Sequence, residues 1–189
     1  RIYGKPVVLS HLGIDIRGRS HRLKLNYRTT EQVLRWALGL VTDDVDDLDG
    51  GRDNAVGYRS LYSGPAPEVI DVATPAAEAA ALVARVRTLV ATTPPEEIAV
   101  VARTRGRVNA YASALVAAGV ACVVLDGDGD GDAAGVRVAT MHRVKGLDFT
   151  HVIMHLPTGG VVARDPRERS LYYVAATRCR RSLTVLRGG

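Results

Sequence analysis

An arginine at the end of an apolar helical stretch is the first residue of this sequence that suggests chemistry. Asp165 and Pro166 are typical of a helix start, because an aspartate caps the first turn and proline fits its first position. Apolar residues then recur at helical spacing over 171–175, and Arg178 falls on the same face. A buried guanidinium needs an anion, which is either an acidic neighbour in a structural ion pair or the phosphate of a bound nucleotide.

A second group of polar residues precedes another expected helix. The stretch 21–28 predicts a strand that runs into a turn, and Thr29 with Gln32 is typical of a capped helix start. Asn26, Tyr27 and Arg28 are therefore expected in a turn between a strand end and a helix, where open α/β sheets bind ligands. The alternative is a surface turn with a packed tyrosine.

A third polar stretch covers residues 140–149 and follows an expected strand at 136–140. Taken alone, a compact basic turn of this kind is typical of a solvated loop. Together, the three stretches offer forked cations for phosphate, an aromatic ring for a base and a carboxylate for a ribose hydroxyl. A nucleoside triphosphate needs this combination of groups.

The elements that must position these residues alternate along the chain. We expect strands at 69–72, 98–102, 120–125, 136–140, 151–154 and 183–186, with helices at 75–91, 108–118 and 165–178. Earlier short strands are expected at 6–9 and 14–16, and the Asp- and Gly-rich stretch 42–67 is expected to be a loop with at most a short strand at 56–61. The alternation predicts an α/β fold in three layers, with a mainly parallel sheet and helices on both faces.

Length and composition limit the alternatives. With 189 residues and 47% hydrophobic residues, we expect a single domain over 1–189. No run is long enough to cross a bilayer and no signal peptide is evident, so no membrane partner is expected. The chain starts at Arg1 rather than Met, which suggests a fragment. Two cysteines give neither a disulfide framework nor metal-ligand spacing, and a reducing cytoplasm is expected.

Charge adds a weak indication of the partner. The net charge is +5, which favours a polyanionic partner such as nucleic acid. The aspartates at alternate positions of 126–132 resemble a calcium loop, but Arg137 stands where an EF-hand needs a bidentate glutamate. We therefore predict a flexible acidic turn there and no metal site.

The three polar stretches resemble motifs of a known family. Residues 26–30 look like motif IV of the UvrD/Rep-like superfamily 1 DNA helicases, residues 140–149 like motif V, and residues 171–178 like motif VI. The resemblance implies a RecA-like second motor domain, the C-terminal half of a helicase. The large accessory insertion of many relatives is absent or minimal, because only a turn fits between 125 and 136. A phosphate loop is not found in the sequence, and Gly4-Lys5-Pro6 does not supply one.

The resemblance also implies a role for each residue. Arg28 and Arg178 would be catalytic and reach the γ-phosphate of ATP. The remaining assignments are Tyr27 against the adenine, Asp148 on the ribose, Gly146 at the close approach to the nucleotide, and Thr140, His142 and Lys145 toward single-stranded DNA or its coupling to ATP. ATP and Mg²⁺ would be held mainly by the N-terminal motor domain of the same protein. The chain alone is thus expected to be inactive as an ATPase.

Two other interpretations remain open from the sequence. One is a RecA-like module that binds nucleic acid or protein without catalysis. The other is an unrelated doubly wound domain of the receiver or nucleotide-binding type, although a receiver needs an acidic pocket at its first strand and this chain begins with basic residues.

Overall fold

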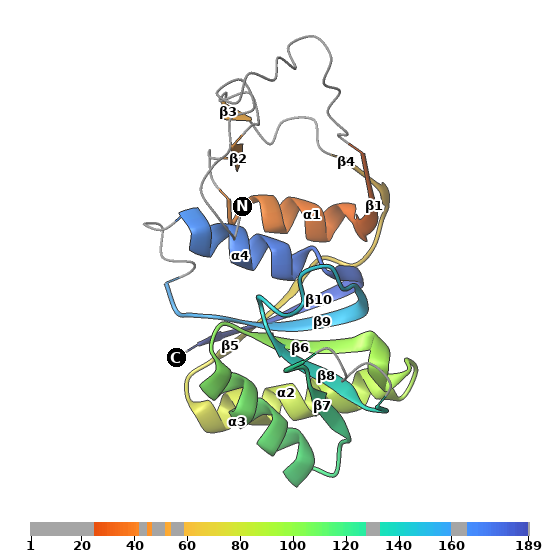
Figure 1. The fold of residues 1–189 in the computed structure, drawn as a ribbon, viewed down its shortest axis with the longest axis vertical. Coiled ribbons are helices and arrows are strands. Elements are labelled where there is room, and N and C mark those ends of the chain that lie inside the picture. The colour runs from red at the N-terminus through yellow and green to blue at the C-terminus, as the bar shows by residue number, and fades with distance from the viewer. Residues whose placement is uncertain are drawn as a thin grey trace.

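A six-stranded parallel sheet forms the centre of the chain in the computed structural model (Figure 1). The structure describes residues 25–41, 45–46, 52–53, 59–127, 133–159 and 166–188. The strand order is β5-β10-β9-β6-β8-β7, and every neighbouring pair is parallel. The strands are β5 (Glu68–Val72), β6 (Ile98–Ala102), β7 (Cys122–Val124), β8 (Val136–Thr140), β9 (Phe149–Leu156) and β10 (Cys179–Gly188).

Helices cover both faces of this sheet, as Figure 1 shows. Helices α1 (Glu31–Leu38) and α4 (Pro166–Ala176) lie side by side on one face, and α2 (Pro75–Val90) and α3 (Arg105–Ala117) lie on the other. A 3₁₀ turn, η2 (Pro95–Glu97), leads into β6. The three-layer α/β fold with a mainly parallel sheet, as predicted from the alternation of elements, is confirmed.

Each face of the sheet has its own hydrophobic core. Strand β6 is buried at all five positions, and its alternate side chains supply both cores. Ala99 and Val101 pack with α1 and α4, whereas Ile98, Val100 and Ala102 pack with α2 and α3. A continuous apolar run is therefore what a central strand covered on both sides requires.

Outside this sheet, two short strands form a separate parallel pair beside α1. They are β1 (Leu25–Thr30) and β4 (Arg59–Tyr62), joined by pairings such as Leu25 with Arg59. Two further strands of two residues each, β2 (Val45–Asp46) and β3 (Arg52–Asp53), pair in antiparallel fashion. The expected number of strands within 42–67, at most one, was therefore too low, because two-residue strands leave no periodicity to detect.

Two expectations near α1 were wrong. Residues 26–28 are not a turn but part of β1, which continues to Thr30. The helix is capped by Thr30, whose hydroxyl accepts from the Val33 backbone N–H at 3.4 Å, and not by Thr29. The expected capping box is also absent, since the Gln32 side chain accepts instead from Gly64 at 2.8 Å. Two adjacent threonines have the same capping chemistry, and only the extent of β1 decides between them.

Most other boundaries agree within a few residues. Helix α3 begins three residues before the predicted start, because Thr104 caps it through the Arg107 backbone N–H and Gly106 lies within its first turn. Strands β9 and β10 extend beyond 151–154 and 183–186 at both ends. The predicted strands at 6–9 and 14–16, the cap Asp165 and most of the acidic turn 126–132 lie outside the described residues. Among the described helices, none has the length and hydropathy needed to cross a bilayer.

Candidate functional site

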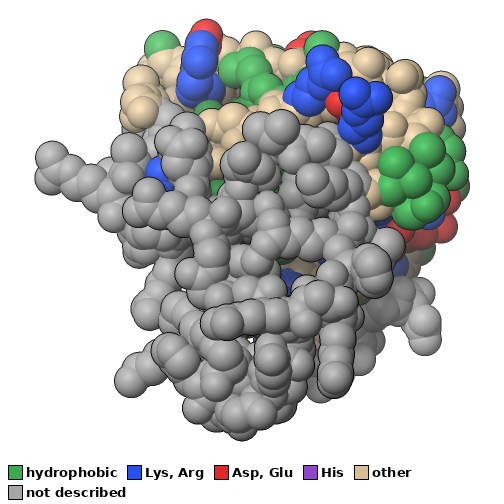
Figure 2. All heavy atoms as spheres, turned by 90° about the horizontal axis from the view of Figure 1, so that it is seen from above, with side chains coloured by type: hydrophobic (Ala, Val, Ile, Leu, Met, Phe, Trp, Pro, Cys, Tyr) green, Lys and Arg blue, Asp and Glu red, His purple; other side chains and the backbone are tan. Residues whose placement is uncertain are grey.

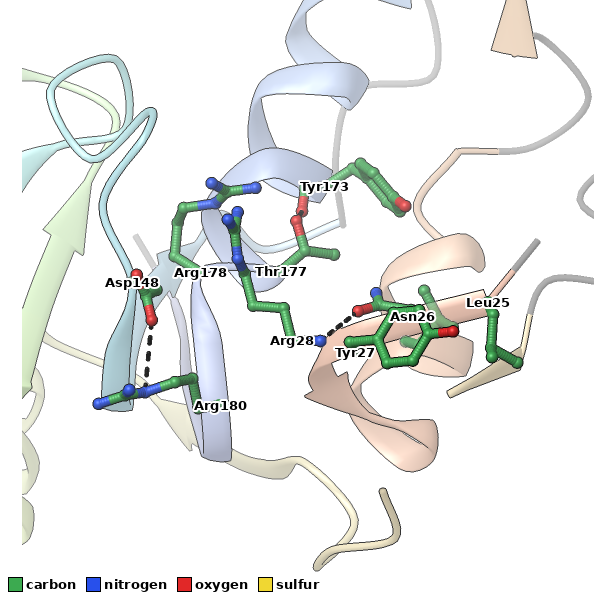
Figure 3. A pocket seen from close by; sticks show the side chains of 10 residues that line it. Leu25, Asn26, Tyr27, Arg28, Asp148, Tyr173, Thr177, Arg178 and Arg180 are labelled. Carbon is green, nitrogen blue, oxygen red and sulfur yellow. Dashed lines mark hydrogen bonds and ion pairs between the residues drawn. The ribbon is translucent and has the colours of Figure 1, made fainter. Parts of the chain in front are cut away.

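A cavity of about 580 Å³ lies between β1 and the amino ends of β9 and β10 (Figure 3). It brings together residues from widely separated parts of the chain. Its lining residues are Leu25, Asn26, Tyr27, Arg28, Leu34, Asp148, Tyr173, Thr177, Arg178 and Arg180. Four residues predicted for the nucleotide site are among them: Tyr27, Arg28, Asp148 and Arg178.

The position of the cavity differs from the sequence-based expectation. Ligands of open α/β sheets usually bind beyond the carboxyl ends of the strands, and residues 26–28 were expected to lie at such an end. Here Asp148 precedes β9 and Arg178 precedes β10, so both enter the cavity from the amino edge of the sheet. Strand β1, which supplies Arg28, is not a member of the six-stranded sheet. The expectation was wrong because β1 lies beside the sheet rather than in it.

The backbone around Arg28 is fixed by a neighbouring amide. The Asn26 Oδ1 accepts from the backbone N–H of Arg28 at 2.7 Å and from that of Thr29 at 3.3 Å. This local bond orients the strand so that the Arg28 side chain extends toward Arg178 (Figure 3). Tyr27 remains 62% exposed, and its ring lines the cavity. An exposed aromatic ring beside a cation is a suitable surface for a planar base.

Backbone carbonyl oxygens from α4 and from the turn before β9 hold the Arg178 side chain. Its Nε donates to the Val174 carbonyl at 3.0 Å, and an Nη donates to the Leu147 carbonyl at 3.4 Å. The preceding Thr177 hydroxyl donates to the Tyr173 carbonyl at 2.9 Å and so helps to close the helix. Carbonyls fix the orientation of the guanidinium without cancelling its charge. Arg178 is therefore oriented and remains available for an anion.

The two arginines repel each other across the cavity. Burial lowers the pKa of Arg178, and the positive charge of Arg28 lowers it further, while Asp148 opposes the shift. Among the described residues, no carboxylate forms an ion pair with Arg28 or Arg178. Within the described residues, Arg178 therefore does not form the internal salt bridge that the sequence left open as the structural alternative. Two like charges directed at one cavity are favourable when an anion occupies it.

Asp148 supplies a carboxylate to the site and is paired with Arg180. Asp148 is the only carboxylate among the lining residues, and its Oδ2 lies 3.4 Å from the Arg180 Nε. Arg180 was not predicted from the sequence. A signal was present, because Arg178 and Arg180 are two residues apart at the start of an extended segment, and such residues share a face.

Four other predicted residues do not line this cavity: Thr140, His142, Lys145 and Gly146. Thr140 is the last residue of β8, and the other three lie in the connection from the carboxyl end of β8 to the amino end of β9. Burial, and then the charge of Arg103, lowers the pKa of His142. Gly146 has φ of +89°, a left-handed conformation that favours glycine, although a Cβ there would meet nothing within 4 Å. The roles of these four residues stay predictions.

Cationic side chains also occur elsewhere on the surface. Figure 2 shows the molecule from above, and the described part of that face carries Lys and Arg side chains in separate groups, with hydrophobic side chains beside them. Several arginines away from the cavity are paired, for example Arg105 with Asp126 and Arg187 with Asp71. The cavity differs from these places because its arginines outnumber its carboxylates.

Comparisons of both sequence and fold find similarity to DNA helicases. The chain is 33% identical over 109 residues to the ATP-dependent DNA helicase UvrD2 of Mycobacterium bovis and of two strains of Mycobacterium tuberculosis. Its fold matches the C-terminal domain of a possible DNA helicase from Lactobacillus plantarum, with a TM-score of 0.67, 20% identity and coverage of 87% of this chain and 88% of that one. The chain resembles the C-terminal domain of UvrD-like DNA helicases. No family model matches it.

The UvrD-like similarity covers too little of the mycobacterial helicases for their whole activity to be stated of this chain. The alignment covers 57% of this chain but only 15% of each mycobacterial helicase. The resemblance stated from motifs IV, V and VI is confirmed, and it concerns a UvrD-like C-terminal domain. The activity of a whole helicase includes steps performed by parts that this similarity does not cover.

Proposed function

We propose that this chain is the C-terminal motor domain of an ATP-dependent DNA helicase or translocase. In this proposal the cavity receives the terminal phosphates of ATP presented by the N-terminal motor domain of the same protein. The convergence of Arg28 and Arg178, both without a carboxylate partner among the described residues, is the observation that carries the proposal. The similarity to UvrD2 and to a helicase C-terminal fold supports it.

The chemistry would be phosphoryl transfer assisted by charge. As the γ-phosphoryl group leaves, negative charge accumulates on its outer oxygens, and two guanidinium groups stabilise that charge. Arg178 is already oriented by the Val174 and Leu147 carbonyls, so little side-chain entropy is lost when the phosphate arrives. Arg28 extends from a different element and completes the clamp.

The remaining lining residues suit the rest of the nucleotide. The exposed ring of Tyr27 would lie against adenine, and the Asp148 carboxylate would accept a ribose hydroxyl. Mg²⁺ would be held mainly by the N-terminal motor domain, where it neutralises charge between the phosphates. The described residues contain no cluster of three potential metal ligands, and the cavity is lined by cations rather than by a carboxylate cage.

Coupling to DNA is assigned to the turn after β8. Thr140 lies at the carboxyl end of β8, and His142 and Lys145 follow in a segment that continues directly to Asp148. A strand of single-stranded DNA near this turn would therefore be linked to the nucleotide site by only a few residues. Because the arginines reach ATP only when two domains close, hydrolysis would be tied to domain motion in the cytoplasm, where ATP and DNA are present.

A steady-state ATPase assay of the intact protein, with and without single-stranded DNA, tests the proposal. The Arg178→Ala variant should lose ~10³-fold or more in turnover, because a cation that stabilises the transition state is removed. Arg181→Ala is the matched control, since Arg181 is an exposed neighbour that does not line the cavity. Near-normal turnover in Arg178→Ala would contradict the proposal and favour a module that binds without catalysis.

A further inference from the structure

Arg180 contacts two carboxylates and one hydroxyl at the edge of the cavity. Its Nε lies 3.4 Å from the Asp148 Oδ2, and an Nη lies 3.6 Å from the Glu97 Oε2. The same Nη donates to the Thr150 hydroxyl at 3.3 Å, and that hydroxyl donates in turn to Glu97. Arg180 therefore connects η2, at the entrance to β6, with the carboxylate of Asp148, which lines the cavity.

The Glu97 side of this network is an anchor. Glu97 and Thr150 are joined to each other by a hydrogen bond and are both half-buried, so together they hold one end of the Arg180 guanidinium. The Nε of the same guanidinium faces Asp148 (Figure 3). Asp148 Oδ1 has no hydrogen-bond partner among the described residues and is free to accept one. Arg180 thus engages one oxygen of Asp148 and leaves the other available.

Asp148 has a competing partner within the same cavity. Its charge also acts on Arg178 and opposes the lowering of the Arg178 pKa. An Asp148 carboxylate that is not held by Arg180 would be drawn toward Arg178, because an ion pair strengthens as two charges approach. Such a pair would remove the acceptor and also neutralise a cation of the phosphate clamp.

We propose that Arg180 is a positioning residue that holds Asp148 as the acceptor for a ribose hydroxyl and keeps it from pairing with Arg178. The proposal rests on the proposed function, because it concerns the nucleotide in the same cavity. It assigns to Arg180 the discrimination between ribonucleotides and deoxyribonucleotides. The phosphate contacts belong to the other two arginines.

Equilibrium binding of ATP, 2′-deoxyATP and 3′-deoxyATP to the intact protein tests this role. A hydrogen bond to a charged acceptor predicts that ATP binds about tenfold more tightly than the analogue that lacks the contacted hydroxyl. In Arg180→Gln this ratio should fall to about 1–2, because Asp148 is no longer held. Arg180→Lys should keep most of the ratio, since a cation still faces Asp148, and Glu97→Gln should lower it by a smaller factor.

Two controls separate the possible outcomes. Asp148→Asn should lower the ratio as much as Arg180→Gln does, and Arg181→Gln, which removes one neighbouring charge, should leave it unchanged. If Arg180→Gln weakens the binding of all three nucleotides equally and the ratio persists, Arg180 acts only through its charge and the positioning role is overturned. A wild-type ratio near 1 overturns it as well. Failure of the wild-type protein to bind any of the nucleotides would contradict the proposed function itself.

Discussion

Arg28 and Arg178 line the same cavity from different sides, one on β1 and the other directly before β10. Burial and the neighbouring charge of Arg28 both lower the pKa of Arg178. Two cations placed at one cavity add no stability to the protein, and this supports the anion site proposed between them. The relationship has consequences for stability as well as for activity.

Removal of Arg28 should affect stability and nucleotide affinity in opposite directions. In Arg28→Gln the repulsion on Arg178 is relieved, so the nucleotide-free protein should be more stable by about 0.5 kcal/mol or less. The same change should weaken ATP binding, because one phosphate contact is lost. Thermal melts and nucleotide titrations of the intact protein measure the two effects. A destabilised Arg28→Gln variant would show that Arg28 has a structural partner instead.

A buried ion pair between α2 and α3 should be important for stability but not for nucleotide binding. Arg107 donates to both oxygens of Glu78, at 2.7 and 2.6 Å, and the Tyr111 hydroxyl donates to the same carboxylate. Glu78 is 4% exposed, so Arg107→Ala would leave its buried charge without a cation and with only the Tyr111 hydroxyl among the donors named here, and should cost about 3 kcal/mol in unfolding free energy.

Arg105→Ala is a matched control in the same helix. Arg105 pairs with Asp126 at 2.6 Å, but both side chains are more than half exposed, so the expected loss is below about 1 kcal/mol. Urea unfolding of the two variants compares them directly. Equal losses would mean that burial of Glu78 does not determine the strength of the interaction.

A buried histidine should make the fold sensitive to acid. His151 forms hydrogen bonds with Thr93 at 3.1 Å and with Ser182 at 2.5 Å. Burial, followed by the charges of Arg181 and Arg85, lowers its pKa from 6.5. The unfolded state therefore binds the proton more readily than the folded state. Stability is fully present above the unfolded pKa of 6.5 and is lost as the pH falls through this value toward the lower folded pKa.

The measurement is unfolding free energy as a function of pH in wild type and in His151→Asn. The variant should show a shallower loss of stability below pH 6.5 than wild type does. A residual slope is expected, because burial also lowers the pKa of His155 and of His142. Parallel pH curves for the two proteins would rule out His151 as a source of the acid sensitivity.

Two glycines should respond to alanine in opposite ways. Gly146 has φ of +89°, so Gly146→Ala should cost about 1 kcal/mol through backbone strain even though its Cβ would meet nothing within 4 Å. Gly106 lies in the first turn of α3 and a Cβ there also meets nothing, so Gly106→Ala should stabilise by about 0.5 kcal/mol. Thermal melts give both values. A neutral Gly146→Ala would indicate that the turn relaxes to a backbone conformation that alanine can adopt.

The sequence by itself determined the three-layer fold. A short continuous apolar run such as 98–102 favours a strand covered on both faces, and the capped amphipathic stretches between such runs favour crossover helices. The resemblance to the family motifs also predicts that Arg28, Asp148 and Arg178 act on one nucleotide. These features are local or ordered along the chain, and for that reason a pattern of residue types is sufficient to detect them.

Only the tertiary structure decided where these residues meet. Strand β1 pairs with β4 outside the main sheet, and this arrangement places Arg28 at the amino edge of β9 and β10 rather than at a carboxyl edge. The contact of Arg180 with Asp148 and Glu97 likewise depends on β10 and β9 being neighbours and on η2 lying beside them. Pairing between distant strands follows from the packing of whole elements, which no local spacing records, and it alone turned three separate motifs into one cavity.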